Sequence, residues 1–157
     1  MSDLRLLLID CDGVLTDGTV SVDQDGRRFK TFHSRDARAI DELVALGWEV
    51  HVVSASGWPG LGPYLERTRS IVHVDHAKTT EALRDIVRGR PYVAVGDDVW
   101  DLEMLAGAAQ AYCPWDSDCA VLEAPRVRRL STCGGRGVLA ELVRRLRYRD
   151  SSPGKGE

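Results

Sequence analysis

Short apolar runs alternate with amphipathic stretches along most of the chain. The apolar runs are rich in Val, Ile or Leu, as is typical of strands in a buried sheet, and they cover 4–10, 48–56, 70–75, 91–98 and 108–113. The stretches between them place apolar residues at helical spacing, over 36–47, 78–89 and 101–108. Strands that alternate with helices predict an α/β fold, a Rossmann-like doubly wound parallel sheet.

Two segments do not follow this alternation. Residues 19–32 alternate polar and apolar positions around Asp25-Gly26, which predicts a β-hairpin directly after the first strand. Residues 134–148 predict a final helix behind a glycine-rich loop. We therefore expect one domain over 1–148 with no cap domain, followed by a disordered tail over 149–157, which lacks apolar anchors.

Composition narrows the class of protein. The chain has 157 residues, enough for one domain with a sizeable core, and its net charge of −3 argues against general affinity for nucleic acid. No apolar run approaches the roughly 20 residues of a membrane span, and the N-terminus does not resemble a signal peptide, so we expect a cytoplasmic protein without a membrane partner. The four cysteines form no C-x-x-C pair, which argues against a zinc site or disulfide framework.

Two acids, Asp10 and Asp12, stand at the end of the first predicted strand with only Cys11 between them. Like charges at this spacing repel, and a buried strand end desolvates them, so the arrangement costs stability unless a cation lies between them. A bound metal ion would remove this conflict.

Polar residues also follow the other predicted strands. Ser54 ends the second strand, Lys78 follows the third, and Asp97 and Asp98 end the fourth. Because open parallel sheets bind ligands at the carboxyl ends of their strands, these groups should meet in one crevice. Acids, a hydroxyl group and an ammonium group together are suited to hold magnesium and a phosphate.

These motifs resemble those of the haloacid dehalogenase-like (HAD) phosphohydrolases. The resemblance covers about Leu4 to Val143 and rests on D-x-D-G-V-L-T-D-G at 10–18, on Ser54 and Lys78, and on G-D-D-x-x-D at 96–101. The hairpin after the first motif, with segments 32–40 and 134–142, is similar to capless phosphatases of sugar acids. The resemblance implies a Mg²⁺-dependent phosphatase whose substrate is a small phosphomonoester, such as 3-deoxy-D-manno-octulosonate 8-phosphate.

The resemblance also implies roles for individual residues. Asp10 would attack phosphorus and form an aspartyl-phosphate, while Asp12 would protonate the leaving oxygen and then activate water. The metal ligands would be Asp10, Asp12 through its backbone carbonyl, and Asp97, with Asp98 and Asp101 in support. The phosphate or substrate would be bound by Gly13, Ser54, Ala55, Lys78 and Arg136.

Some positions depart from the pattern of the capless sugar-acid phosphatases. Ala55-Ser56 stands where that group commonly has Gly-Arg, Ala37 replaces a glycine, and Cys133 replaces a lysine. Two other functions stay open, namely a binding module with an inactive site and a phosphotransferase or mutase. We prefer the hydrolase because every catalytic-type residue is present and no cap-sized insertion follows the first motif or the second strand.

The predicted hairpin bears on assembly. Val20, Val22, Phe29 and Phe32 give it an apolar face, and an isolated two-stranded hairpin is marginal in water. The resemblance implies a homotetramer joined through such hairpins, in which Arg136 approaches a substrate crevice. The alternative is that the hairpin packs on its own domain and Arg136 merely follows a helix-starting loop.

Overall fold

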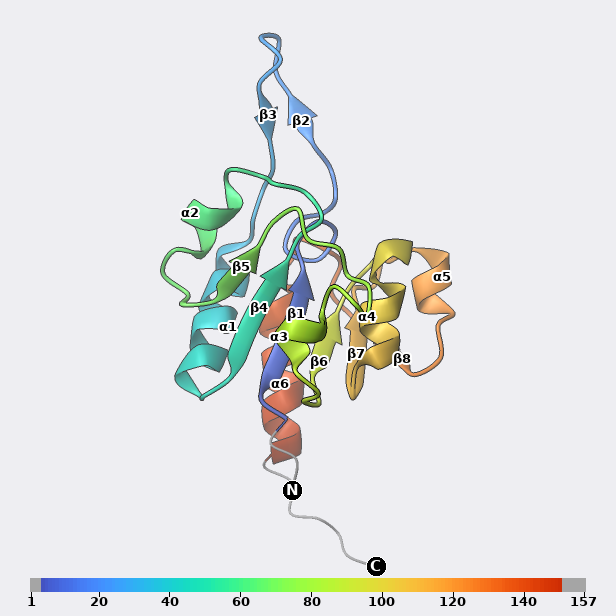
Figure 1. Ribbon diagram of the computed structural model, residues 1–157. Coiled ribbons are helices and arrows are strands. Elements are labelled where there is room, and N and C mark those ends of the chain that lie inside the picture. Colours follow the sequence, from blue (N-terminus) through green and yellow to red (C-terminus); the bar gives the residue numbers. More distant parts are fainter. Residues whose placement is uncertain (1–3, 151–157) are drawn as a thin grey trace, which may run out of the picture.

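The computed structural model describes residues 4–150 and contains a six-stranded, fully parallel sheet (Figure 1). In space the strands follow the order β5-β4-β1-β6-β7-β8. Their bounds are Leu6–Asp10 for β1, Glu49–Val53 for β4, Ile71–His73 for β5, Val93–Val95 for β6, Gln110–Cys113 for β7 and Val127–Arg129 for β8. The order reverses direction at β1, so the predicted doubly wound α/β fold is confirmed.

Strand β1 lies at the centre of the sheet, and all five of its residues are buried. Leu7 and Ile9 belong to the core on one face, which is covered by α1 (Ser34–Ala45) and α6 (Val138–Asp150). Leu6 and Leu8 belong to the core on the other face, where α3 (Arg84–Val87) and α4 (Leu102–Gly107) pack. Since β1 is apolar on both faces, its backbone position is fixed between two helical layers, and so is the acid that ends it.

The predicted hairpin is present, although its paired strands are short. Strands β2 (Ser21–Val22) and β3 (Arg28–Phe29) are antiparallel, and they project away from the sheet (Figure 1). The Asp23 carboxylate accepts hydrogen bonds from the backbone N–H groups of Asp25 and Arg27, which closes the turn around Gly26. No cap domain accompanies the hairpin within residues 4–150.

The single apolar face predicted for the hairpin is not found, because the pairing places Val22 opposite Arg28 and Phe29 opposite Ser21, on opposite faces. The Phe32 ring stacks on Tyr64, with 4.3 Å between ring centroids, and joins the core. Val22 and Phe29 remain 63% and 50% exposed. The hairpin therefore exposes one apolar side chain on each of its two faces.

The helix predicted over 78–89 is wrong at its start, because α3 begins only at Arg84. Residues 79–83 form turns instead, in which the Thr79 hydroxyl accepts from the N–H of Ala82. A threonine side chain that binds nearby backbone competes with helix formation. The helix ends at Val87, and its C-cap residue Arg88 has a left-handed backbone with φ of 51°, just before Gly89.

Three short elements were not predicted: α2 (Leu61–Leu65), α5 (Cys119–Leu122) and β8. A 3₁₀-helix, η1 (Val99–Asp101), also precedes α4. Segments this short carry too few residues for a periodic apolar pattern, so neighbouring elements determine their conformation.

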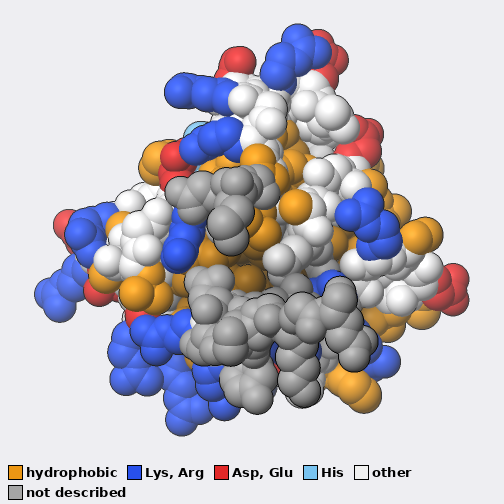
Figure 2. All heavy atoms as spheres, turned by 90° about the horizontal axis from the view of Figure 1, so that it is seen from below, with side chains coloured by type: hydrophobic (Ala, Val, Ile, Leu, Met, Phe, Trp, Pro, Cys, Tyr) orange, Lys and Arg blue, Asp and Glu red, His pale blue; other side chains and the backbone are white. Residues whose placement is uncertain are grey.

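The C-terminal end corrects one further prediction. Helix α6 continues to Asp150, so the disordered tail predicted from 149 is wrong for 149–150, and 151–157 lie outside the described residues. The end of the molecule opposite the hairpin carries several separate groups of Lys and Arg side chains (Figure 2). Arginines of α6 are partly paired with acids, since Arg145 binds Glu141 and Arg147 binds Glu42. Among the described residues, no helix has both the length and the apolar character that a membrane span requires.

Candidate active site

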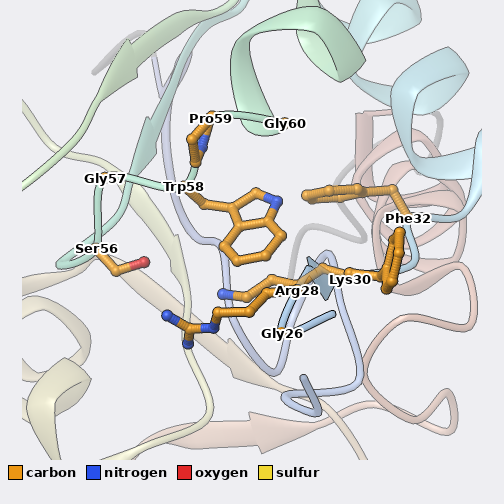
Figure 3. A pocket seen from close by; sticks show the side chains of 10 residues that line it. Gly26, Arg28, Lys30, Phe32, Ser56, Gly57, Trp58, Pro59 and Gly60 are labelled. Atoms are coloured by element: carbon orange, nitrogen blue, oxygen red, sulfur yellow. The ribbon is translucent and has the colours of Figure 1, made fainter. Parts of the chain in front are cut away.

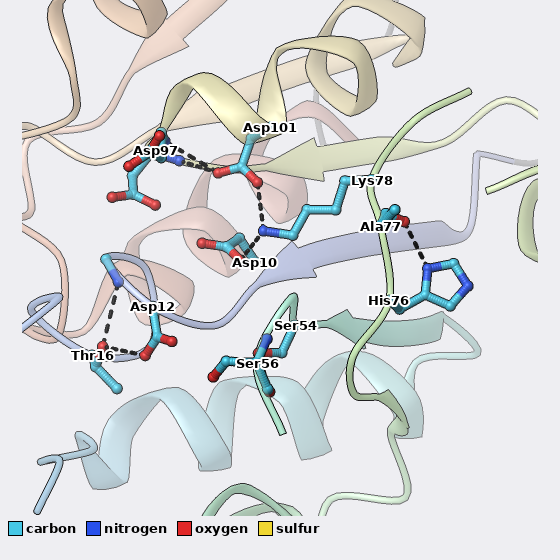
Figure 4. A network of polar contacts seen from close by, with 12 residues as sticks. Asp10, Asp12, Thr16, Ser54, Ser56, His76, Ala77, Lys78, Asp97 and Asp101 are labelled. Atoms are coloured by element: carbon cyan, nitrogen blue, oxygen red, sulfur yellow. Dashed lines mark hydrogen bonds and ion pairs between the residues drawn. The ribbon is translucent and has the colours of Figure 1, made fainter. Parts of the chain in front are cut away.

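The carboxyl ends of β1, β4 and β6 form the floor of the candidate site. Asp10 is the last residue of β1, Ser54 directly follows β4, and Gly96 and Asp97 follow β6. Because these strands are adjacent and parallel, their ends lie at the same edge of the sheet. Lys78 reaches the same place from the loop after β5 (Figure 4).

A buried ion-pair network connects three of these groups. The Lys78 ammonium contacts the Asp10 carboxylate and lies 2.7 Å from Oδ1 of Asp101. The three side chains are at most 6% exposed. Buried charges are tolerated only when they are paired, so this lysine stabilises two carboxylates that would otherwise repel each other.

Asp101 also organises the loop after β6. Its Oδ2 accepts hydrogen bonds from the backbone N–H of Asp97 at 2.8 Å and of Asp98 at 3.2 Å. Both oxygens of Asp101 are therefore engaged, one with Lys78 and one with backbone. The side chain holds the loop that carries Asp97, whereas Asp98 itself is exposed.

Asp97 approaches the loop after β1 very closely. A Cβ added to Gly13 would lie only 1.8 Å from Oδ2 of Asp97, and Gly13 has a φ of +89°. Any side chain at position 13 would thus occupy the space of the Asp97 carboxylate. The absence of a side chain at Gly13 lets the carboxylate reach the end of β1.

The site has the donors and the charge that a divalent cation requires. Carboxylate oxygens of Asp10, Asp97 and Asp101 lie within 4.8 Å of one another. Oδ1 of Asp97 is buried and has no hydrogen-bond partner among the described residues. A buried oxygen without a donor needs a partner, and hard divalent cations prefer oxygen ligands. The residues present therefore fit a divalent metal ion.

The pKa values point to the same deficit of positive charge. Burial raises the pKa of Asp10 well above its ordinary value, and the neighbouring Asp101 raises it further. Burial also raises the pKa of Asp97 to about 7. Burial alone would lower the pKa of Lys78, but Asp10 and Asp101 raise it above its usual value. The Lys78 ammonium is thus the positive charge that lies near Asp10, Asp97 and Asp101, and a bound cation would favour the charged form of each acid.

Asp12 points away from this cluster of carboxylates. Its Oδ1 accepts from the Lys30 ammonium at 2.6 Å and from the Thr16 hydroxyl at 3.3 Å. The Asp12 side chain is 34% exposed, while that of Lys30 is only 6% exposed. The Asp12 carboxylate is therefore not among the clustered oxygens, and it faces the open side of the site.

Lys30 was not predicted as a site residue from the sequence. No local motif distinguishes it, because it lies just after β3 among other basic residues, and 18 positions separate it from Asp12. Only the folding of the hairpin back towards the end of β1 brings the two side chains together. The hairpin prediction could have raised this possibility, but it did not identify the residue.

The other predicted residues lie at or near the same edge. The Ser54 hydroxyl is buried and donates to the carbonyl of Ser56 at 2.9 Å, whereas Ala55 is exposed. Arg136 is exposed and close enough to Asp17 to help lower the pKa of that carboxyl, which hydrogen bonds from Thr19 lower most. The glycine loop before α6 packs on its own chain, with the N–H of Gly135 donating to the carbonyl of Val14 at 3.0 Å.

Comparison with known proteins gave matches in sequence and in structure, although no family model matches the chain. The 3-deoxy-D-manno-octulosonate 8-phosphate phosphatase of Haemophilus influenzae is 28% identical over 148 residues, covering 90% of this chain and 82% of the relative. The cobalt-bound structure of the phosphatase of that name from Haemophilus influenzae is 27% identical, with a TM-score of 0.82. It covers 92% of this chain and 87% of that one.

A crystal structure from Streptomyces avermitilis, named for the HAD family of hydrolases, is 26% identical with a TM-score of 0.81. That match covers 89% of this chain and 83% of the other. The relatives thus share the sheet, and they match nearly the whole described chain. In sequence and in fold the chain therefore resembles haloacid dehalogenase-like hydrolases, and among them the 3-deoxy-D-manno-octulosonate 8-phosphate phosphatases.

Proposed function

We propose that the protein hydrolyses phosphomonoesters of sugar acids with Mg²⁺ and through a phosphorylated Asp10. The observation that carries this proposal is the position of Asp10. It ends a buried strand, pairs with Lys78, and lies beside an Asp97 oxygen that lacks a partner. This arrangement suits a carboxylate that must approach a phosphate in spite of its own charge.

In the first step an Asp10 oxygen attacks phosphorus and the bond from phosphorus to the ester oxygen breaks. The Asp12 carboxyl gives its proton to the departing oxygen, so the alcohol leaves neutral. Asp12 suits this role because it stands two residues beyond the nucleophile and faces the open side of the site. Lys78 remains close to Asp10 and reduces the repulsion between its carboxylate and the phosphoryl oxygens.

In the second step the Asp12 carboxylate takes a proton from water, and the resulting hydroxide attacks the aspartyl-phosphate. The bond between Asp10 and phosphorus breaks, inorganic phosphate leaves, and both aspartates return to their starting states. Lys30 would hold the Asp12 carboxylate during both proton transfers, since it contacts Oδ1 directly. Ser54, Ala55 and the backbone N–H of Gly13 would contact the phosphoryl oxygens.

Asp10 and Asp97 would hold the metal ion with the backbone carbonyl of Asp12, while Asp98 and Asp101 support the loop. When bound, the ion supplies positive charge that stabilises the negative charge of the reacting phosphate. We propose Mg²⁺ because the available donors are oxygens, which this hard ion prefers. The structure of the relative from Haemophilus influenzae is a cobalt-bound form, which supports the choice of a divalent ion.

The curated relatives support the choice of substrate class. Proteins named as phosphatases of 3-deoxy-D-manno-octulosonate 8-phosphate match about nine tenths of this chain. A phosphotransferase or mutase would need to protect the phosphorylated aspartate from water. The described residues contain a hairpin and no cap domain above the site, which favours hydrolysis.

We also propose that the protein acts as a homotetramer joined through its hairpins. The exposed Val22 on a projecting hairpin supports this assembly. Arg136 would then approach a substrate crevice of a neighbouring subunit. Its exposure beside the loop after β1 leaves it accessible for such a contact.

Release of inorganic phosphate tests the catalytic proposal. We expect turnover of 3-deoxy-D-manno-octulosonate 8-phosphate with Mg²⁺, and none after chelation with EDTA. Asp10→Asn should lower kcat by about a thousandfold or more, because it removes the nucleophile but keeps its size. The matched control is Asp85→Asn, which changes an exposed acid on α3 and should leave kcat within about twofold.

Three outcomes would contradict the proposal. Full activity of Asp10→Asn would show that another group attacks phosphorus. Absence of phosphate release from every phosphomonoester by the folded wild-type protein would favour a binding module. Transfer of the phosphoryl group to an added sugar at the expense of free phosphate would favour a phosphotransferase.

A further inference from the structure

A pocket of about 810 Å³ lies between the hairpin and the loop that follows β4 (Figure 3). Its wall on one side comes from β3 and the residues after it, and on the other side from 56–60. The lining combines three aromatic rings, those of Phe29, Phe32 and Trp58, with the cationic side chains of Arg28 and Lys30. Apolar walls with a few charged groups are typical of pockets for small ligands.

The pocket adjoins the candidate active site through two of its lining residues. Lys30 lines the pocket and also contacts Oδ1 of Asp12 at 2.6 Å. Ser56 lines the pocket, and its carbonyl accepts a hydrogen bond from the buried Ser54. A substrate whose phosphate reacts beside Asp12 would therefore extend its remaining atoms into this pocket.

The indole of Trp58 lies at the centre of the charged part of the pocket. The Lys30 ammonium is 4.7 Å from the centroid of the indole, and the Arg28 guanidinium is 5.8 Å from it. Figure 3 shows both side chains running past the indole, with their charged ends on the side of Ser56. A planar apolar surface and two cations therefore lie together in the pocket.

The two cations differ in what balances their charge. Lys30 is paired with Asp12, whereas Arg28 makes no ion pair within residues 4–150. Arg28 therefore presents an uncompensated guanidinium to the pocket. A guanidinium binds a carboxylate through two parallel N–H donors, and this geometry selects planar anions.

We propose that this pocket binds the carboxylated sugar portion of the substrate, with the apolar face of the sugar on Trp58 and its carboxylate at Arg28. This inference rests on the proposed function and adds the residues that select the substrate. Arg28 distinguishes a phosphorylated sugar acid from the sugar phosphate without a carboxylate. Trp58 binds the carbon skeleton that both kinds of substrate share.

The test compares substrates that differ only in the carboxylate. 6-Phosphogluconate and sorbitol 6-phosphate form such a pair, and 3-deoxy-D-manno-octulosonate 8-phosphate extends the series to a longer acid. The wild-type protein should show a higher kcat/KM for the acids. Arg28→Gln should reduce the ratio of kcat/KM between acid and alcohol by about tenfold, as expected for the loss of one charged hydrogen bond.

Two further variants control this measurement. Arg27→Gln removes the neighbouring cation, which pairs with Asp25 and does not line the pocket, so it should change the ratio by less than about twofold. Trp58→Leu should lower kcat/KM for both 6-phosphogluconate and sorbitol 6-phosphate. Equal ratios in the wild type and Arg28→Gln, for every acid in the series, would overturn the proposal, as would an equal effect of Arg27→Gln.

A binding experiment separates failure of the pocket from failure of the proposed function. Calorimetry with Asp10→Asn measures affinity for the same ligands without turnover. Tighter binding of the acids that depends on Arg28 supports the pocket even if the wild type proves inactive. Affinity that does not depend on Arg28 overturns the pocket even if the wild type is an active phosphatase.

Discussion

We expect Lys30 to set the orientation of the Asp12 carboxyl group, the proposed acid. Its ammonium contacts the carboxylate of Asp12, which within residues 4–150 accepts one other hydrogen bond, of 3.3 Å, from Thr16. Lys30→Met should lower kcat by about tenfold, since a misplaced acid loses part of the 10²- to 10⁴-fold contribution of proton transfer. KM should change less, and Lys30→Arg should restore part of kcat. Steady-state kinetics provide the measurement, and an unchanged kcat in folded Lys30→Met would show that Asp12 does not depend on this contact.

Gly13 provides a second prediction at the residue scale. Gly13→Ala adds a methyl group 1.8 Å from Asp97, so we expect the carboxylate to move and divalent-metal affinity to fall by at least about tenfold. Unfolding in urea should show a loss of roughly 2 kcal/mol or more, from the clash together with the positive φ. The control is Gly26→Ala, where φ is +78° but nothing lies within 4 Å. That variant should lose only about 1 kcal/mol, and equal losses would contradict the close approach of Gly13 and Asp97.

The sequence allowed some of the site to be anticipated. Asp10, Lys78 and Asp97 could be grouped because each follows a strand that a periodic apolar pattern identifies. Lys30 and the double role of Asp101 could not, since both depend on how loops fold over the strand ends. Periodicity locates strand ends, whereas contacts between loops depend on tertiary packing that no local pattern encodes.

At the scale of elements, helices α1 and α6 are linked by a buried acid. Asp36 in the first turn of α1 is fully buried, and its Oδ1 accepts from the N–H groups of Leu139 and Ala140 at the start of α6. Its Oδ2 has no hydrogen-bond partner among residues 4–150. Burial raises the pKa of Asp36 from 3.8 to about 6, although the N-terminal N–H groups of α6 oppose this rise.

This raised pKa gives a pH-dependent contribution to stability. Between about pH 4 and 6 the folded protein keeps a proton on Asp36 that the unfolded chain has released. The contribution of Asp36 to the free energy of unfolding therefore falls as pH rises. The loss amounts to roughly 3 kcal/mol and is complete above about pH 6. Asp36→Asn cannot ionise, so it should lack this decrease. Urea unfolding of the wild type and of Asp36→Asn at pH 4 and pH 7 measures this decrease. Equal losses of stability in the two proteins would contradict the assignment to Asp36.

The elements themselves were predictable to different degrees. Helix α1 and the hairpin have strong local signals, namely helical periodicity and Asp25-Gly26, and both are present. Helix α3 is shorter than predicted because Thr79 and its neighbours form turns, and β8 is a three-residue edge strand that exists through pairing with β7. Local sequence signals therefore predict elements that a segment forms by itself, and they miss strands that exist through pairing with a neighbouring strand.

For the whole molecule, the topology determines how open the site is. The direction of the sheet reverses at β1, which places Asp10 at the crevice edge, and the hairpin leaves the same edge and projects beyond it. The hairpin supplies Lys30 to the site and one wall of the pocket, whereas the exposed Val22 does not line the pocket. Val22 is therefore available for contact with a second subunit.

Assembly can be tested at this residue. Val22 is 63% exposed and does not line the pocket, so Val22→Asp places a charge in the proposed contact, opposite Arg28 on the same hairpin. Burying a pair of charges in an apolar interface costs free energy, so we expect the tetramer to dissociate at micromolar concentration in sedimentation experiments. Leu46→Asp is the control, because Leu46 is a similarly exposed apolar residue at the far end of α1 and should leave the assembly unchanged. A wild-type protein that sediments as a monomer of 17.3 kDa with full activity would exclude the tetramer. If the tetramer forms and Val22→Asp lowers activity in proportion to its dissociation, neighbouring subunits complete each site.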